Sequence, residues 1–90
     1  MANTTTKKRD AFLSRPLCDC ALRDVPGVGE TAHDKLVERV QTPQQLLGHF
    51  MLHGPEATLR WLQDDCAIRA QEANRINDAL ALKAARLALV

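Results

Sequence analysis

The chain has 90 residues and a formal net charge of +1, which excludes a broadly basic, histone-like DNA-binding protein. Any contact with nucleic acid therefore has to come from a local basic patch that neutralises few phosphates. The aromatic residues are two phenylalanines and one tryptophan, which argues against a surface that stacks single-stranded bases. A chain of this length is expected to form one domain over residues 1–90, and such small domains often gain stability by oligomerising.

The spacing of apolar residues is helical throughout, and no alternating β-branched run is present. The sequence therefore predicts an all-α fold, a compact bundle of five to six short helices with a long C-terminal helix. Residues 1–6 are expected to form a mobile tail. Thr6 is the expected N-cap of a first helix over residues 7–15, which Pro16 ends.

Residues 20–39 contain two short helical patterns around the turn Pro26-Gly27-Val28-Gly29. This arrangement predicts a helix-hairpin-helix whose second helix begins at about Gly29. The first N–H groups of that helix have no partner within it, and together with the positive end of the helix dipole they suit a phosphate oxygen. Such a contact carries no base information, so the expected ligand is a nucleic-acid backbone of any sequence. The alternative interpretation is an ordinary corner between two helices with a glycine-rich turn.

The next helix has a well-defined start, with Thr42 as N-cap, Pro43 in the first turn and Gln45 completing a capping box. Its predicted apolar face consists of Leu46, Leu47, Phe50 and Met51. Gly54 is expected to end this helix and Pro55 to start another.

A last helix is predicted over residues 68–89. From Ala79 onward its apolar residues spread around most of the circumference, which predicts burial in the core or against a partner.

The three cysteines are an odd number, which excludes a disulfide framework and favours a reducing, intracellular compartment. Cys18, Cys20 and Cys66 lack the second close pair that zinc sites use, so no metal site and no cofactor are predicted. His49 and His53 lie one turn apart without a third ligand beside them, and they are expected to be surface histidines.

Neither a catalytic constellation nor a phosphate-binding loop of the ATP type occurs in the sequence, so an enzyme is not expected. No apolar run is long enough to insert into a membrane.

Four segments together resemble the barrier-to-autointegration factor family: TTTKKRDAFLSRP, PGVGETAHDKLVER, LLGHF and RWLQDDC. The resemblance implies a SAM-like helical fold and a homodimer that bridges double-stranded DNA without sequence preference. It also implies a chromatin protein of the nucleus and cytoplasm, with LEM-domain, lamin or histone proteins as further partners.

The resemblance assigns functional positions to particular residues. The implied DNA-binding residues are Gly27, Val28 and Gly29 through their backbone, and Lys8, Lys35 and Arg75 through their side chains. The family's N-terminal phosphorylation cluster falls on Thr4, Thr5 and Thr6. Each phosphate there would add up to about two negative charges beside the DNA-facing helix.

Several positions differ from the family pattern. Asp34 stands where a basic residue is usual, His33 stands where a small one is usual, and a basic position on the last helix is replaced by Gln71 or Glu72. These differences keep a second function open, a dimeric protein-interaction or adaptor module with weak or no DNA binding. A third possibility is a DNA-binding module cut from a larger protein, which would be a monomer in solution.

Overall fold

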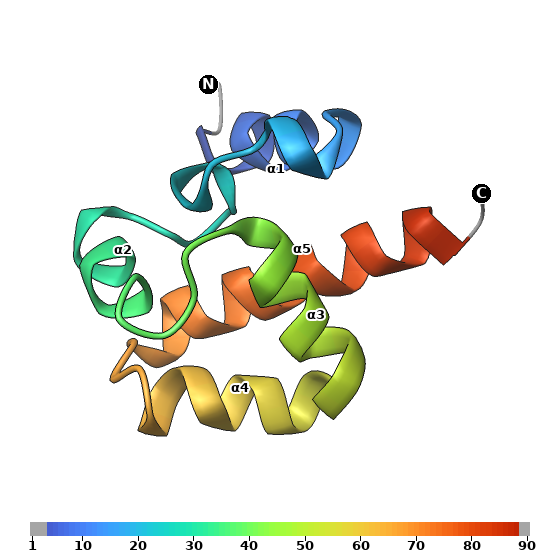
Figure 1. The fold of residues 1–90 in the computed structure, drawn as a ribbon. Helices are drawn as coiled ribbons and strands as arrows, with labels where there is room; N and C mark the ends of the chain where they lie inside the picture. The colour runs from blue at the N-terminus through green and yellow to red at the C-terminus, as the bar shows by residue number, and fades with distance from the viewer. Residues whose placement is uncertain (1–3, 89–90) are drawn as a thin grey trace.

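The computed structural model describes residues 4–88, which form an all-helical fold (Figure 1). In chain order, its elements are α1 (Thr4–Ser14), η1 (Leu17–Asp19), η2 (Leu22–Asp24), α2 (Glu30–Leu36), α3 (Pro43–His53), α4 (Pro55–Asp64) and α5 (Ala70–Ala88), where η denotes a single 3-10 turn. The predicted all-α bundle with a long C-terminal helix is therefore confirmed.

Helix α5 runs through the middle of the molecule, and the other helices are arranged around it (Figure 1). It contacts α1, α3 and α4 along its length. The turn that precedes α2 packs on the first two turns of α5. The N-terminal end of α5 therefore lies against the turn before α2, and its C-terminal end lies on the side of the molecule away from α2 (Figure 1).

Helix α1 begins at Thr4, so the predicted start at residue 7 with Thr6 as N-cap is wrong. Thr4, Thr5 and Thr6 are the first residues of a helix rather than part of a tail, and residues 1–3 lie outside the described residues. The helix ends at Ser14, two residues before Pro16, as the proline predicts.

A buried lysine holds the C-terminal end of α1 against α5. The ammonium group of Lys83 donates to the carbonyl oxygens of Phe12 at 2.8 Å, Leu13 at 3.3 Å and Arg15 at 2.6 Å. Its side chain is only 4% exposed, and its Nζ lies 5.3 Å from the centre of the Phe12 ring. The last carbonyls of a helix have no partner within it and carry partial negative charge, so a cation is well suited to this position.

Replacing Lys83 with methionine is expected to lower the free energy of unfolding by about 2 to 3 kcal/mol, because three carbonyl oxygens lose a charged donor. Urea unfolding followed by circular dichroism measures this change as a lower midpoint. The matched control is Lys7→Met on the exposed surface of α1, which is expected to change stability by less than about 0.5 kcal/mol. Equal midpoints for the two variants would show that the Lys83 contacts contribute nothing.

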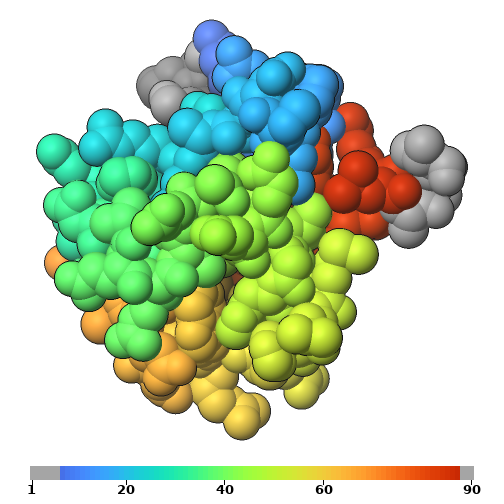
Figure 2. Space-filling model, in the orientation of Figure 1, coloured from blue at the N-terminus to red at the C-terminus, as the bar shows by residue number. Residues whose placement is uncertain are grey.

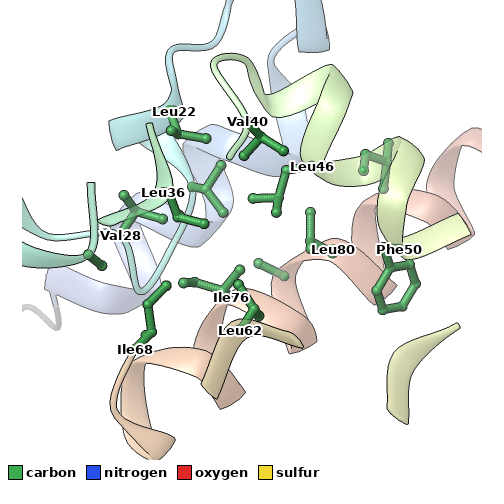
Figure 3. Packing of buried hydrophobic residues seen from close by; sticks show 14 of the residues in the cluster. Leu22, Val28, Leu36, Val40, Leu46, Phe50, Leu62, Ile68, Ile76 and Leu80 are labelled. Carbon is green, nitrogen blue, oxygen red and sulfur yellow. The ribbon is translucent and has the colours of Figure 1, made fainter. Parts of the chain in front are cut away.

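The core is built from all the described elements except η1 (Figure 3). Side chains from η2, the hairpin turn and α2 meet those of α3, α4 and α5. The largest fully buried apolar side chains include Phe12, Val25, Val28, Leu36, Leu46, Leu62, Ile76 and Leu80. Because Val25 and Val28 are among them, the hairpin turn is part of the core and has a fixed position.

The start and end of α3 follow the sequence signals. The Thr42 side chain accepts a hydrogen bond from the Gln45 amide at 3.2 Å, as predicted. The Gln45 side chain accepts from the amide of Gln41 at 2.6 Å, one residue before the position that a capping box uses. Gly54 ends the helix with a φ of +89°, and Pro55 begins α4 directly.

Several apolar side chains remain exposed in one copy of the chain. Met51, which was predicted to belong to the buried face of α3, is 64% exposed, and its neighbour Leu52 is 79% exposed. Leu82 and Leu87 on α5 are also exposed. The end of α3 and the C-terminal half of α5 lie on the same side of the molecule, away from α2 (Figures 1 and 2).

Candidate nucleic-acid interface

The hairpin consists of one 3-10 turn, η2, a tight turn over residues 25–29, and α2. The first arm is therefore shorter than the α-helical arm that the sequence predicted. The Asp24 carboxylate accepts a hydrogen bond from the Ala21 amide at 2.8 Å and so fixes the start of η2. In Figure 2 the hairpin, coloured cyan to green, occupies one side of the molecule below α1.

Gly27 is the point at which the hairpin turn touches α5. Its φ of +93° is a left-handed conformation that residues with a Cβ rarely adopt. A Cβ atom at this position would lie 2.7 Å from the backbone oxygen of Glu72 and 2.9 Å from side-chain atoms of Arg75 and Ile76. The need for glycine here comes from packing inside the protein.

Val28 is buried, and both of its backbone groups have partners. Its amide donates to the carbonyl of Val25 at 3.0 Å, and its carbonyl accepts from the Lys8 ammonium at 2.9 Å. Val28 is therefore not one of the unpaired amides that the sequence predicted in this turn. Burial lowers the pKa of Lys8 below its ordinary value, and the negative charge of Asp24 opposes that shift.

Gly29 is exposed and is the N-cap of α2. Among the hydrogen bonds of residues 7–87, whose side chains the structure describes, none uses the N–H of Gly29 or those of the first turn of α2. A Cβ added at Gly29 would meet no atom within 4 Å, and Gly29 and the first residues of α2 line a surface depression. These N–H groups are available to an anion.

A depression of about 230 Å³ lies beside these donors, between the N-terminus of α2 and the N-terminus of α5. The residues that line it are Gly29, Glu30, Thr31, Ala32, Lys35, Ile68, Arg69 and Glu72. Neither His33 nor Asp34, the two residues that differ from the family pattern on α2, is among them. His33 is half-buried, and its Nδ1 lies 3.7 Å from the Asp34 carboxylate.

The basic residues around the depression are held to different degrees. The Lys35 ammonium donates to the carbonyl of Ala67 at 2.7 Å, which ties α2 to the loop between α4 and α5. Arg75 is exposed on α5 next to Gly27. Arg69 is exposed and lines the depression, and it is not among the DNA-binding residues predicted from the sequence. Its position depends on the turn at Ala67, whose φ of +54° no sequence signal predicts.

The cysteine and histidine side chains of the described residues contain no cluster of three or more potential metal ligands. Burial raises the pKa of the Cys66 thiol to about 11. His53 is exposed as predicted, but His49 is half-buried and stacks on Trp61 with ring centres 4.2 Å apart. In the described part of the chain, no helix is long and apolar enough to cross a membrane.

Comparison with known proteins gives one match. The model of the barrier to autointegration factor family matches residues 3–84, which covers the hairpin, the depression and most of α5. Searches of the curated proteins and of the solved structures gave no match. On the strength of this match over nearly its whole length, the chain belongs to the barrier-to-autointegration factor family, a family of DNA-binding chromatin proteins.

Proposed function

We propose that this protein binds double-stranded DNA without sequence preference, and that a homodimer bridges two duplexes. The observation that carries the proposal is a set of N–H groups, at Gly29 and in the first turn of α2, that have no partner among residues 7–87 and lie at the edge of the depression. Backbone donors at a helix N-terminus favour a phosphate oxygen and read no base.

The implied DNA-binding residues are compatible with this contact in different ways. Lys8 and Lys35 each donate to one backbone carbonyl, and an ammonium group has further donors that remain for a phosphate. Arg75 adds an exposed charge beside the turn. Gly27 and Val28 contribute by fixing the turn from which the Gly29 amide projects.

The exposed apolar side chains support the dimer part of the proposal. Met51 and Leu52 on α3 and Leu82 and Leu87 on α5 lie on segments at the side of the molecule away from the hairpin. Two copies joined through that side by a two-fold axis would present their hairpins in different directions. Such an arrangement lets one dimer hold two duplexes.

Gel-shift titrations with several duplexes of unrelated sequence test the DNA contact, and light scattering tests the dimer. We expect similar affinities for all duplexes and a mass of two chains. Bridging is tested by immobilising one duplex and measuring whether the protein captures a second, labelled duplex. Affinities that depend on sequence, or no binding at low salt, would contradict the DNA proposal, and a monomer would contradict the bridging proposal.

Glutamate at positions 4, 5 and 6 is expected to weaken duplex binding and to leave the fold intact. Thr4, Thr5 and Thr6 form the first turn of α1, where negative charge favours the helix dipole. The same charges repel phosphates near the helix that carries Lys8. Duplex titration at low and high salt measures the effect, which should be larger at low salt because salt screens charge. Glutamine at the same positions is the uncharged control, and equal affinities for the two variants would show that charge there has no effect.

A second candidate is a dimeric adaptor that recruits protein partners and holds little or no DNA. The hydrogen bonds that occupy Lys8 and Lys35, and the exposure of Met51 and Leu52, favour it. Its partners would be LEM-domain, lamin or histone proteins in the nucleus and cytoplasm. A protein that is dimeric in light scattering but does not shift any duplex would identify this function.

A further inference from the structure

The loop between α4 and α5 holds Arg69 in a fixed position at the edge of the depression. Ile68 is buried, and its amide donates to the carbonyl of Leu62 at 2.9 Å. The Arg69 carbonyl accepts from the Ala73 amide at 2.8 Å, which closes the first turn of α5. These two hydrogen bonds fix the backbone on both sides of the Arg69 side chain. The Cα atom of Arg69 therefore has a defined position at the edge of the depression.

The two basic side chains that line the depression differ in whether they form hydrogen bonds within the protein. Lys35 is half-buried, and its ammonium is bound to the carbonyl of Ala67. Arg69 is exposed, and its guanidinium makes no hydrogen bond or ion pair with any residue in the range 7–87. The guanidinium of Arg69 can therefore reorient towards a phosphate and bind two of its oxygens at once.

Glu72 is an acidic residue among those that line the same depression. Glu72 lies in the first turn of α5, and its Oε2 atom is buried without a hydrogen-bond partner among the described residues. Glu72 forms no ion pair with Arg69 or Lys35, because no side-chain nitrogen of these two residues lies within 4 Å of its carboxylate oxygens. Its charge is therefore not neutralised by a contact and acts on any anion that enters the depression.

We propose that Arg69 and Glu72 set the DNA affinity of this site in opposite directions. Arg69 binds the phosphate that the Gly29 amides orient, and Glu72 repels it. The proposal rests on the DNA-binding function proposed above. It assigns one further phosphate contact to Arg69, in addition to those proposed for Lys8, Lys35 and Arg75.

The first test compares Arg69→Gln with Arg60→Gln in duplex titrations over a range of salt concentrations. Arg60 is also exposed, but it lies on α4 beside Trp61, so its loss makes the same change in net charge elsewhere. Arg69→Gln is expected to weaken binding about tenfold at low salt and to reduce the salt slope by about 1, the contribution of one phosphate contact. Equal affinities and slopes for the two variants would overturn the assignment of Arg69.

The second test is Glu72→Gln, which keeps the shape of the side chain and removes its charge. Removing one repelling charge is expected to tighten duplex binding about three- to fivefold at low salt. Partial unfolding of the variant would not increase the affinity, so a gain cannot be mistaken for a loss of structure. An unchanged or weaker affinity would overturn the role of Glu72.

The DNA-binding function and the assignment of Arg69 are contradicted by different results. If the parent protein binds no duplex, the DNA-binding function itself is wrong. If the parent binds and Gly29→Asp abolishes binding, but Arg69→Gln behaves like Arg60→Gln, the function stands and the assignment of Arg69 is wrong. Circular dichroism melting of each variant confirms that the folded state is being compared.

Discussion

The variant Gly29→Asp is expected to lose more than tenfold in duplex affinity while its fold is unchanged or slightly stabilised. Gly29 has the extended φ of −88° that N-cap residues adopt, and a side chain there meets no neighbouring atom. Aspartate at an N-cap accepts hydrogen bonds from the first-turn amides and favours the helix dipole. It would thus occupy the donors that a phosphate needs and add a repelling charge. Loss of one charge-assisted hydrogen bond, about 1.5 to 3 kcal/mol, gives the expected decrease.

The matched control is Thr42→Asp, which places the same residue type at the N-cap of another helix. Thr42 is exposed and already caps α3 through its side chain, so aspartate keeps that cap and makes the same change in net charge. Gel-shift affinity and thermal melting of both variants separate a local effect from a general one. If Gly29→Asp binds duplexes as tightly as Thr42→Asp, the N-terminus of α2 is not the phosphate contact.

Where a residue's role depends on its immediate neighbours in the chain, the sequence predicts it well. The N-cap at Thr42, the end of α3 at Gly54 and the start of α2 after Gly29 all follow from signals within one turn of helix. The all-α fold follows from the spacing of apolar residues, which is also a local property. Each of these predictions is confirmed by the structure.

Predictions that depend on distant contacts failed. The apolar pattern of the last helix gave no sign that Lys83 is buried, because its partners are carbonyls about 70 positions away at the end of α1. Met51 matches the apolar spacing of α3, yet no other element covers it in one copy of the chain. One local prediction failed as well: Thr6 is a residue type that often caps helices, but it lies within α1, which begins at Thr4.

In the candidate site too, local features were predicted from the sequence and contacts between distant segments were not. The sequence placed a phosphate contact at the glycine-rich turn but treated Gly27 and Gly29 as equivalent. The structure separates them, because Gly27 packs against α5 and Gly29 faces open space. Arg69 was missed because it reaches the depression through the unusual turn at Ala67. Lys35 was selected for its place on α2, and its bond to the Ala67 carbonyl requires a contact between distant segments.

Because Gly27 packs against α5, the second large expected effect is the destabilisation of the protein by Gly27→Ala. The left-handed φ of +93° and the Cβ contacts of 2.7 to 2.9 Å act together. Strain at such a φ and overpacking against the backbone oxygen of Glu72 are expected to lower the free energy of unfolding by about 3 to 5 kcal/mol in total. For a domain of this size, the melting temperature should fall on the order of 20 °C. Thermal melting followed by circular dichroism measures the change.

Two other glycines separate the causes of this loss. Gly54 has a similar φ of +89° but open space around its Cβ position, so Gly54→Ala should cost only the conformational strain, about 1 to 3 kcal/mol. Gly29→Ala has neither strain nor a contact and should leave the melting temperature nearly unchanged. Equal losses at Gly27 and Gly54 would mean that the turn does not press on α5. The expected order, with Gly27 far the most sensitive, would show that packing against α5 fixes the position of the turn.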